Sequence, residues 1–302
     1  MAYSKAIVRL SEGANKVVIK MTNNLSQETE KKYQALIHQL KNMKSVAVAF
    51  SGGVDSSFLL HAAQKALKDQ VIAITVVASL VPEHEQQRAI QMAKETGVHH
   101  ILMPGKEEAE PKIAENSVER CYYCKKHLFT MMEQRAIEEG YVVLVDGTNI
   151  DDAQDYRPGR KALKELGIRS PLEEVGLTKE EIRQLSKAAG LSSWNLPAMA
   201  CLASRIPYGT RITKEKLKRI ETCEALLLRL GYRELRVRDH DQVARIELNP
   251  AEMTKFLQSG HQEEIIRSFK AAGFKYVTLD LEGYRMGSLN EGKVEKQLKV
   301  KS

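Results

Sequence analysis

The sequence predicts an α/β protein with a doubly wound parallel sheet, followed by a smaller C-terminal α+β domain. In the first half of the chain, apolar β-branched runs alternate with stretches whose apolar residues recur at helical spacing. Strands that are separated by helices pair in parallel, and such sheets have helices on both faces. After about residue 195 the order changes to a helix, two neighbouring strands, two helices and a last strand.

The first expected helix covers residues 27–41, where Tyr33, Leu36 and Leu40 share one face. Strands are then expected at 46–50, 71–77, 99–103 and 141–146, and helices at 55–68, 83–96, 107–117 and 123–139. In the second domain we expect a helix at 213–230, strands at 234–238 and 243–248, helices at 250–257 and 261–272, and a strand at 276–281.

These patterns divide the chain into a poorly ordered extension (1–25), an α/β domain (26–195), an α+β domain (196–290) and a charged tail (291–302). The longest apolar runs are too short to cross a bilayer, and the first 20 residues lack the apolar core of a signal peptide. We therefore expect a cytoplasmic protein. The net charge of +7 suits a phosphorylated substrate or RNA, but it equally fits a mildly basic surface.

The strongest motif is Ser51-Gly52-Gly53-Val54-Asp55-Ser56, which lies between an expected strand and an expected helix. A glycine turn at a helix N-terminus directs backbone N–H groups and the positive end of the helix dipole at one point, which favours a phosphate. The motif is not a Walker loop, because no Gly-Lys-Ser/Thr is present. Asp55 is suited to hold Mg²⁺ or to cap the helix.

This motif resembles the pyrophosphate loop of the ATP pyrophosphatase (PP-loop) superfamily. Further elements follow in order: Asp146-Gly147-Thr148-Asn149-Ile150-Asp151-Asp152, Asp155-Tyr156-Arg157-Pro158-Gly159, Arg169-Ser170-Pro171-Leu172, Ser204-Arg205-Ile206-Pro207-Tyr208-Gly209 and Arg236-Val237-Arg238. Together they resemble the LarE-type ATP-dependent sulfur transferases of nickel-pincer nucleotide synthesis, over roughly residues 27–290.

The resemblance implies that ATP activates a carboxylate of pyridinium-3,5-biscarboxylic acid mononucleotide, with release of pyrophosphate, and that sulfur then displaces AMP. It also implies roles for residues that match the family motifs. The expected ATP and Mg²⁺ contacts are Ser51, Gly52, Gly53, Asp55 and Ser56. Residues expected to neutralise the phosphate of the substrate or of AMP are Ser204, Arg205, Arg236 and Arg238.

The cysteines bear on the source of sulfur. Some family members sacrifice a cysteine, but that position falls on Ala200 here, with Cys201 beside it. Another branch binds a 4Fe–4S cluster through three cysteines, which the resemblance places at Cys121, Cys124 and Cys201. Cys-x-x-Cys alone also fits zinc (with His127 as a further ligand), thiol exchange or an incidental pair. Cys223 lies in a helical pattern and is expected to pack there.

Three other functions compete with this interpretation. A tRNA thiolase also combines a PP-loop with a 4Fe–4S cluster, although no RNA-binding module is evident. An ammonia-using ligase of the NAD-synthetase type would not need the three cysteines, and a nucleotide sensor would not need catalysis. We expect a small-molecule nucleotide substrate, no nucleic acid or membrane partner and a sulfide donor that the sequence does not identify. The resemblance also implies a homo-oligomer, such as a hexamer.

Overall fold

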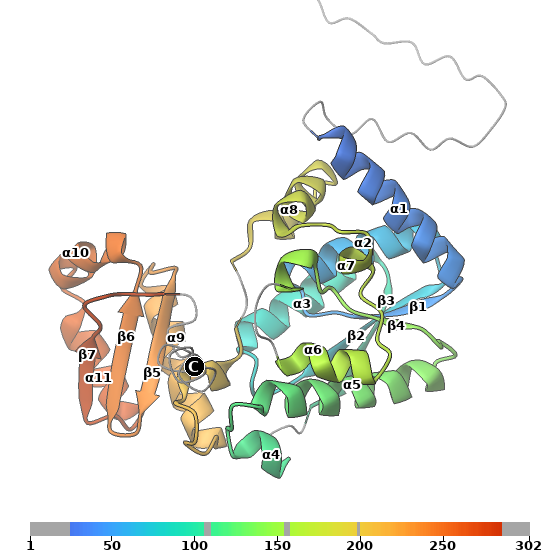
Figure 1. The fold of residues 1–302 in the computed structure, drawn as a ribbon. Coiled ribbons are helices and arrows are strands. Elements are labelled where there is room, and N and C mark those ends of the chain that lie inside the picture. Colours follow the sequence, from blue (N-terminus) through green and yellow to red (C-terminus); the bar gives the residue numbers. More distant parts are fainter. Residues whose placement is uncertain (1–24, 106–109, 154–157, 198–199, 286–302) are drawn as a thin grey trace, which may run out of the picture.

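A computed structural model describes residues 25–105, 110–153, 158–197 and 200–285. The expected extension before residue 25 and the expected tail lie outside the described residues, as do 155–157 of the Asp155–Gly159 element. In Figure 1 a larger unit built on one sheet lies beside a smaller unit built on a second sheet. The expected fold class is therefore confirmed.

The first sheet contains four parallel strands in the order β3-β2-β1-β4. Their bounds are β1 (Val46–Ala49), β2 (Val71–Val77), β3 (His99–Pro104) and β4 (Leu144–Val145). The chain runs from β1 through β2 to β3 and then returns to the other side of β1. The carboxyl ends of β1 and β4 thus flank the point where the winding direction reverses, where open α/β sheets bind ligands.

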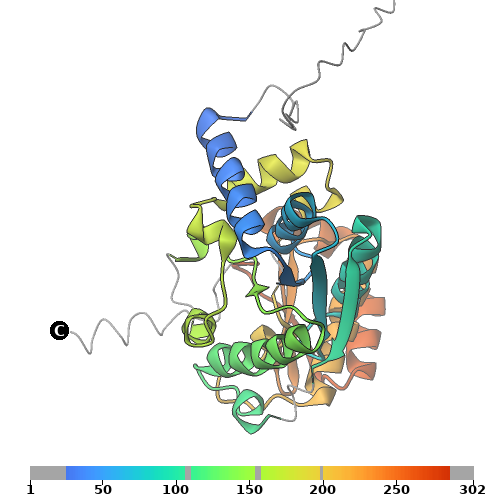
Figure 2. The ribbon, with the colours of Figure 1, turned by 90° about the vertical axis from the view of Figure 1, so that its right-hand side faces the viewer.

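Helices cover both faces of this sheet (Figures 1 and 2). One face packs against α1 (Gln27–Met43), α2 (Val54–Leu67), α3 (Glu83–Thr96) and α8 (Lys179–Ala188). The other face packs mainly against α5 (Arg120–Glu138) and α6 (Pro158–Glu165). Short helices lie in the connecting segments: α4 (Pro111–Ala114), η2 (Ile150–Ala153), α7 (Pro171–Glu174), η3 (Ser192–Asn195) and η4 (Leu202–Arg205). No helix in the described ranges is long and apolar enough to span a membrane.

The second sheet has the order β5-β6-β7, with β5 antiparallel and β7 parallel to β6. Its elements are α9 (Lys214–Arg229), β5 (Leu235–His240), β6 (Val243–Leu248), α10 (Pro250–Gln258), α11 (Gln262–Ala271) and β7 (Tyr276–Leu279). Its core includes Tyr232 and Phe269, which are fully buried. Cys223 on α9 lies in this core, as expected. The predicted domain boundary near residue 195 stays a prediction.

Three expected elements differ from the structure. The strand expected at 141–146 is limited to Leu144–Val145, because the Tyr141 N–H donates to Ala136 O of the preceding helix and Val142 is exposed. Of the helix expected at 107–117, residues 107–109 lie outside the described residues, and within 110–117 the helix covers only Pro111–Ala114. The helix expected at 123–139 already begins at Arg120, so the Cys-x-x-Cys pair lies in its first two turns.

A buried asparagine joins the segment before α5 to the loop after η4. Asn116 is fully buried, and its side-chain amide donates to the carbonyls of Ile206 (3.2 Å), Pro207 (2.9 Å) and Thr210 (3.0 Å). Its backbone has φ +55°, a region in which asparagine is among the few residues found often. The two cysteine-bearing segments are therefore held in a fixed relation.

Replacing Asn116 by alanine should destabilise the protein by about 1–3 kcal/mol, because buried carbonyls lose their donor. Alanine at positive φ adds strain to this loss. The matched control is Asn42→Ala, since Asn42 is exposed on α1 and bonds only to His38 in the described structure; it should change stability by less than about 0.5 kcal/mol. Urea unfolding measures both, and equal midpoints would contradict the assigned role.

Candidate active site

The glycine motif forms a tight loop between β1 and α2. Gly52 has φ +73°, and Gly53 is the N-cap of α2 in an extended conformation. The Ser51 and Ser56 hydroxyls lie 3.0 Å apart, and the Gly53 N–H donates to Ser51 Oγ at 3.3 Å. The loop therefore holds its shape through its own serines, and the N-terminus of α2 faces the carboxyl edge of the sheet.

The Asp146–Asn149 turn lies directly against this loop. A Cβ at Gly147 would come within 2.9 Å of the Ser56 backbone nitrogen, so only glycine permits this approach. Asp146 fixes the turn, because it accepts from the Thr148 hydroxyl (2.6 Å) and the Ser170 hydroxyl (2.6 Å). The two motifs that the sequence predicts at the sheet edge thus form one site.

Asp55 and Lys179 form an ion pair at the mouth of the loop. Lys179 Nζ lies 2.5 Å from Asp55 Oδ2, and the other carboxylate oxygen is buried with no hydrogen-bond partner among the described residues. Burial raises the pKa of Asp55, and the charge of Lys179 opposes that rise. The Lys179 backbone N–H donates to Asp151 Oδ2 at 2.7 Å, which ties α8 to the second motif.

Sequence reasoning missed Lys179, although a signal was present. Thr178 and Glu181 form a capping box that places Lys179 in the first turn of α8. A positive charge in the first turn of a helix is repelled by the positive end of the helix dipole, so helix stability does not explain a lysine at this position. Its contact with Asp55 supplies one.

A cavity of about 650 Å³ opens between these motifs. Its lining includes the glycine loop, the Asp146–Asn149 turn, Lys179, the carboxyl end of β2 and one face of α5. Lys125 reaches this cavity from α5, with Nζ 3.9 Å from Asp146 Oδ2 and 4.7 Å from the centre of the Phe129 ring. The cavity size and its two lysines suit a nucleotide with its phosphates.

The arginines that the sequence singles out lie outside this cavity and differ in their surroundings. Arg205 makes two bonds of 2.9 Å to the Glu224 carboxylate, and Arg238 makes a similar pair with Glu247 at 2.9 and 2.8 Å. All four side chains are buried. Sequence reasoning missed Glu224 as a partner, because buried ion pairs between distant elements leave no local pattern.

Within the described part of the chain, Arg236 forms no ion pair with a carboxylate. It donates to Leu235 O (2.6 Å), and its guanidinium lies 4.9 Å from the centre of the Tyr284 ring. Burial and the neighbouring charges of Arg205 and Arg238 lower its pKa. Arg205 and Arg238 are thus neutralised by carboxylates, whereas Arg236 is not. The Ser204 hydroxyl donates to Cys201 O at 2.7 Å, so it is engaged in its own turn.

The structure brings the three predicted cysteines to the junction of the two units. Cys124 and Cys201 pack at the edge of an apolar cluster that joins Leu80 and Ile113 to the segment from Leu202 to Ile220. The buried guanidinium of Arg120 lies 3.8 Å from Cys121 Sγ. All three thiols are partly buried, and none forms a disulfide.

The three cysteine thiols are donors of the type that binds iron–sulfur clusters. No three His, Cys, Asp or Glu side chains within the described ranges converge on one ion. His127, the possible fourth zinc ligand, instead has its Nε2 3.2 Å from Gly105 O. Three thiols around an iron–sulfur cubane bind different irons, so they need not meet at one point. The chemistry of the donors therefore fits such a cluster, whose presence stays a prediction.

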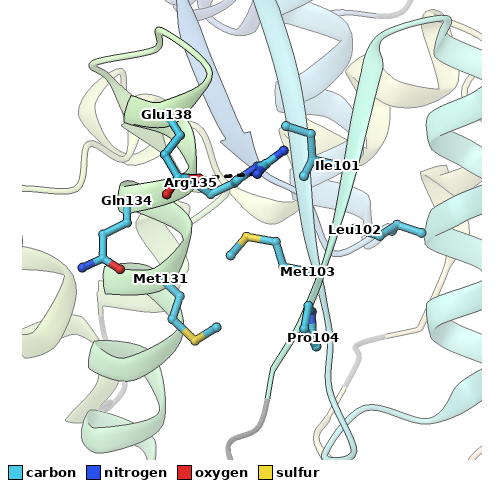
Figure 3. Close-up of a pocket in the computed structure, with 8 residues that line it drawn as sticks. All are labelled: Ile101, Leu102, Met103, Pro104, Met131, Gln134, Arg135 and Glu138. Carbon is cyan, nitrogen blue, oxygen red and sulfur yellow. Dashed lines mark hydrogen bonds and ion pairs between the residues drawn. The ribbon is translucent and has the colours of Figure 1, made fainter.

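A second cavity, of about 350 Å³, lies between the edge strand β3 and the C-terminal half of α5 (Figure 3). Met103 and Met131 line it, and its charged residues Arg135 and Glu138 pair with each other. It contains neither the glycine loop nor a cysteine. The candidate chemistry is therefore assigned to the cavity that the glycine loop lines.

Comparison with known proteins identifies the family of the chain. A model of the PP-loop domain matches residues 25–155. The chain is 35% identical over 268 residues to pyridinium-3,5-bisthiocarboxylic acid mononucleotide synthase of Lactiplantibacillus plantarum, covering 88% of this chain and 96% of that protein. The chain belongs to the LarE family of PP-loop ATP-dependent sulfurtransferases.

Two other relatives differ in the share of the chain that they match. An uncharacterized protein of Synechocystis is 44% identical over 262 residues, covering 86% of this chain and 97% of that protein. A component of the glutamine-hydrolysing GMP synthase of Methanococcus maripaludis is 28% identical over 178 residues, covering 54% of this chain and 55% of that protein. The Lactiplantibacillus and Synechocystis relatives thus match 88% and 86% of the chain, whereas the GMP synthase component matches 54%.

Gly52→Ala tests the loop geometry. A Cβ at Gly52 would lie 2.7 Å from Ala89 Cα, so the loop must shift. Gly97→Ala is the matched control, because Gly97 also has positive φ but nothing within 4 Å of its Cβ position. Both should lose about 1–2 kcal/mol from strain, and Gly52→Ala about 1–3 kcal/mol more from overpacking. ATP affinity, measured by calorimetry, should fall only for Gly52→Ala; unchanged affinity there would contradict the assignment.

Proposed function

We propose that this chain adenylates a carboxylate of pyridinium-3,5-biscarboxylic acid mononucleotide and converts it to a thiocarboxylate. The name of the Lactiplantibacillus relative supports the product class. The observation that carries the proposal lies on α5. Lys125 faces the nucleotide cavity, while Cys121 and Cys124 lie within one turn of it on the same helix. Activation and sulfur delivery are therefore adjacent.

In the first step, a carboxylate oxygen attacks the α-phosphorus of ATP, and the bond to pyrophosphate breaks. The N-terminus of α2 and the backbone of Gly52 and Gly53 bind the departing pyrophosphate. Lys179 and Lys125 neutralise charge that develops on the phosphate oxygens. Preorganisation of these groups lowers the barrier because they need not reorient during reaction.

Mg²⁺ fits the same place. The Asp55 carboxylate has a buried oxygen without a partner among the described residues, and oxygen donors are what Mg²⁺ prefers. Mg²⁺ is commonly held by one or two carboxylates together with substrate phosphates, so a complete protein cage is not needed. Asp55, with Asp151 nearby at the Lys179 backbone, would hold it.

Arg236 is proposed to bind the phosphate of the mononucleotide substrate. A planar guanidinium binds phosphate through two parallel hydrogen bonds. Arg205 and Arg238 are proposed to position this subsite rather than to bind substrate directly, since each already holds a carboxylate. Ser204 links them, because its carbonyl accepts from Arg238 at 2.6 Å and its hydroxyl oxygen lies 3.1 Å from Arg205 Nη1.

In the second step, sulfur bonds to the acyl carbon while the C–O bond to AMP breaks, and AMP leaves with the electron pair. Cys121, Cys124 and Cys201 are proposed to hold a 4Fe–4S cluster. When bound, it would supply an iron that the protein does not ligate, where sulfide can be carried. This chain's residues hold the three partly buried thiols at the junction. Because the transferred sulfur would come from bound sulfide, no cysteine Cβ–S bond would break and the cysteines would not be consumed.

Pyrophosphate release tests the activation step. The wild-type protein should release pyrophosphate only when ATP and the pyridinium biscarboxylate are both present. Lys179→Met should lower kcat/KM about 10²–10³-fold, because a preorganised charge is lost. Lys187→Met is the matched control, since Lys187 lies on the same helix but stacks on Trp194, 4.6 Å from the ring centre. No substrate-dependent release by wild type, or equal rates for both variants, would contradict the proposal.

Cys124→Ala tests the sulfur step separately. It should release pyrophosphate at near the wild-type rate but lose bound iron and thiocarboxylate formation. Cys223→Ala is the matched control, because Cys223 is buried in the second core and burial raises the pKa of its thiol to about 12. Iron analysis and mass spectrometry of the product measure the two outcomes. Multi-turnover thiolation by Cys124→Ala would rule out the cluster.

A further inference from the structure

Arg120 is a buried cation for which the structure offers no carboxylate. The residue is 3% exposed, and within the described residues it forms no ion pair with an Asp or Glu. Its polar contacts are Asn116 Oδ1, Ala203 O at 3.0 Å and Cys121 Sγ at 3.8 Å. The Tyr208 ring centre lies 5.3 Å from the guanidinium carbon.

The other deeply buried arginines of the described chain behave differently. Arg205 and Arg238 each make two hydrogen bonds to one buried carboxylate. A buried charge that lacks a counter-charge costs several kcal/mol, so proteins seldom leave one uncompensated. Arg120 is therefore expected to face an anion that protein carboxylates do not provide.

The cysteines are the groups positioned to provide that anion. Arg120 directly precedes Cys121, and it also holds the carbonyl of Ala203, close after Cys201 in the chain. The same guanidinium thus lies against both cysteine-bearing segments.

We propose that Arg120 is a positioning residue whose charge compensates the thiolates of Cys121, Cys124 and Cys201 when they bind the cluster. This inference rests on the proposed cluster. The guanidinium fork also holds the loop after Cys201 at a fixed distance from the first turn of α5. Arg120 therefore stabilises the anionic ligand set and favours the reduced, more negative state of the cluster.

The test compares Arg120→Gln, Arg120→Lys and the wild type after anaerobic reconstitution. Arg120→Gln should shift the reduction midpoint potential to a more negative value, because a nearby cation is lost. Its cluster should also be lost to a chelator about 10–100-fold faster, as is typical when a partner of a metal ligand is removed. Arg120→Lys retains the charge and should keep a potential close to wild type.

Arg135→Gln is the matched control, because Arg135 lies on the same helix and pairs with Glu138 and Glu139 near the surface. It should leave potential and cluster lifetime unchanged. A purely structural role predicts equal cluster loss in both Arg120 variants, without a change in the potential of the remaining cluster, and would overturn the inference. Wild-type lifetime and potential in Arg120→Gln would overturn it as well.

The outcomes separate this inference from the function on which it rests. If the wild type takes up no iron, the proposed cluster is wrong, and the inference fails with it. If the wild type binds a cluster that Arg120→Gln retains unchanged, only the inference fails. Thermal melting of the cluster-free proteins reports folding. If Arg120→Gln does not fold, Arg120→Lys decides, since a large negative shift of its potential would contradict charge compensation.

Discussion

Val48 of β1 pairs with Val145 of β4, and this parallel register places the two following loops against each other. The contact is so close that a Cβ at Gly147 would touch the backbone of the first turn of α2. The glycine loop, the Asp55–Lys179 pair and the Asp146 turn all meet at this edge. Without this strand pairing the glycine motif would still begin a helix, but the Asp146–Asn149 turn would not line the cavity opposite it.

At the junction of the two units, buried polar groups hold separate segments of the chain together. Asn116 and Arg120 bind the segment around η4 from one side, while Arg205, held by Glu224, binds the carbonyl of Cys201 from the other. These bonds hold a cysteine from a distant part of the chain next to a helix that also carries Lys125. The proposed activation and sulfur transfer would then take place close to each other.

Much of this could be predicted from the sequence, because local patterns determine it. The strand–glycine–helix succession predicts the loop, and strand–helix alternation predicts the sheet. The roles of arginines were harder to predict: the partners of Arg205 and Arg238 come from other elements and only the fold brings them together. Lys179 was missed for the same reason, since Asp55 lies far from it in the chain.

The central claim is that ATP activates a substrate carboxylate by transfer of AMP. Labelling the carboxylates of the pyridinium mononucleotide with oxygen-18 tests this most directly. If a carboxylate oxygen attacks the α-phosphorus and the acyl C–O bond later breaks, one labelled oxygen must appear in each AMP. The account predicts labelled AMP together with unlabelled pyrophosphate. AMP without label, or formation of ADP instead of AMP, would contradict it.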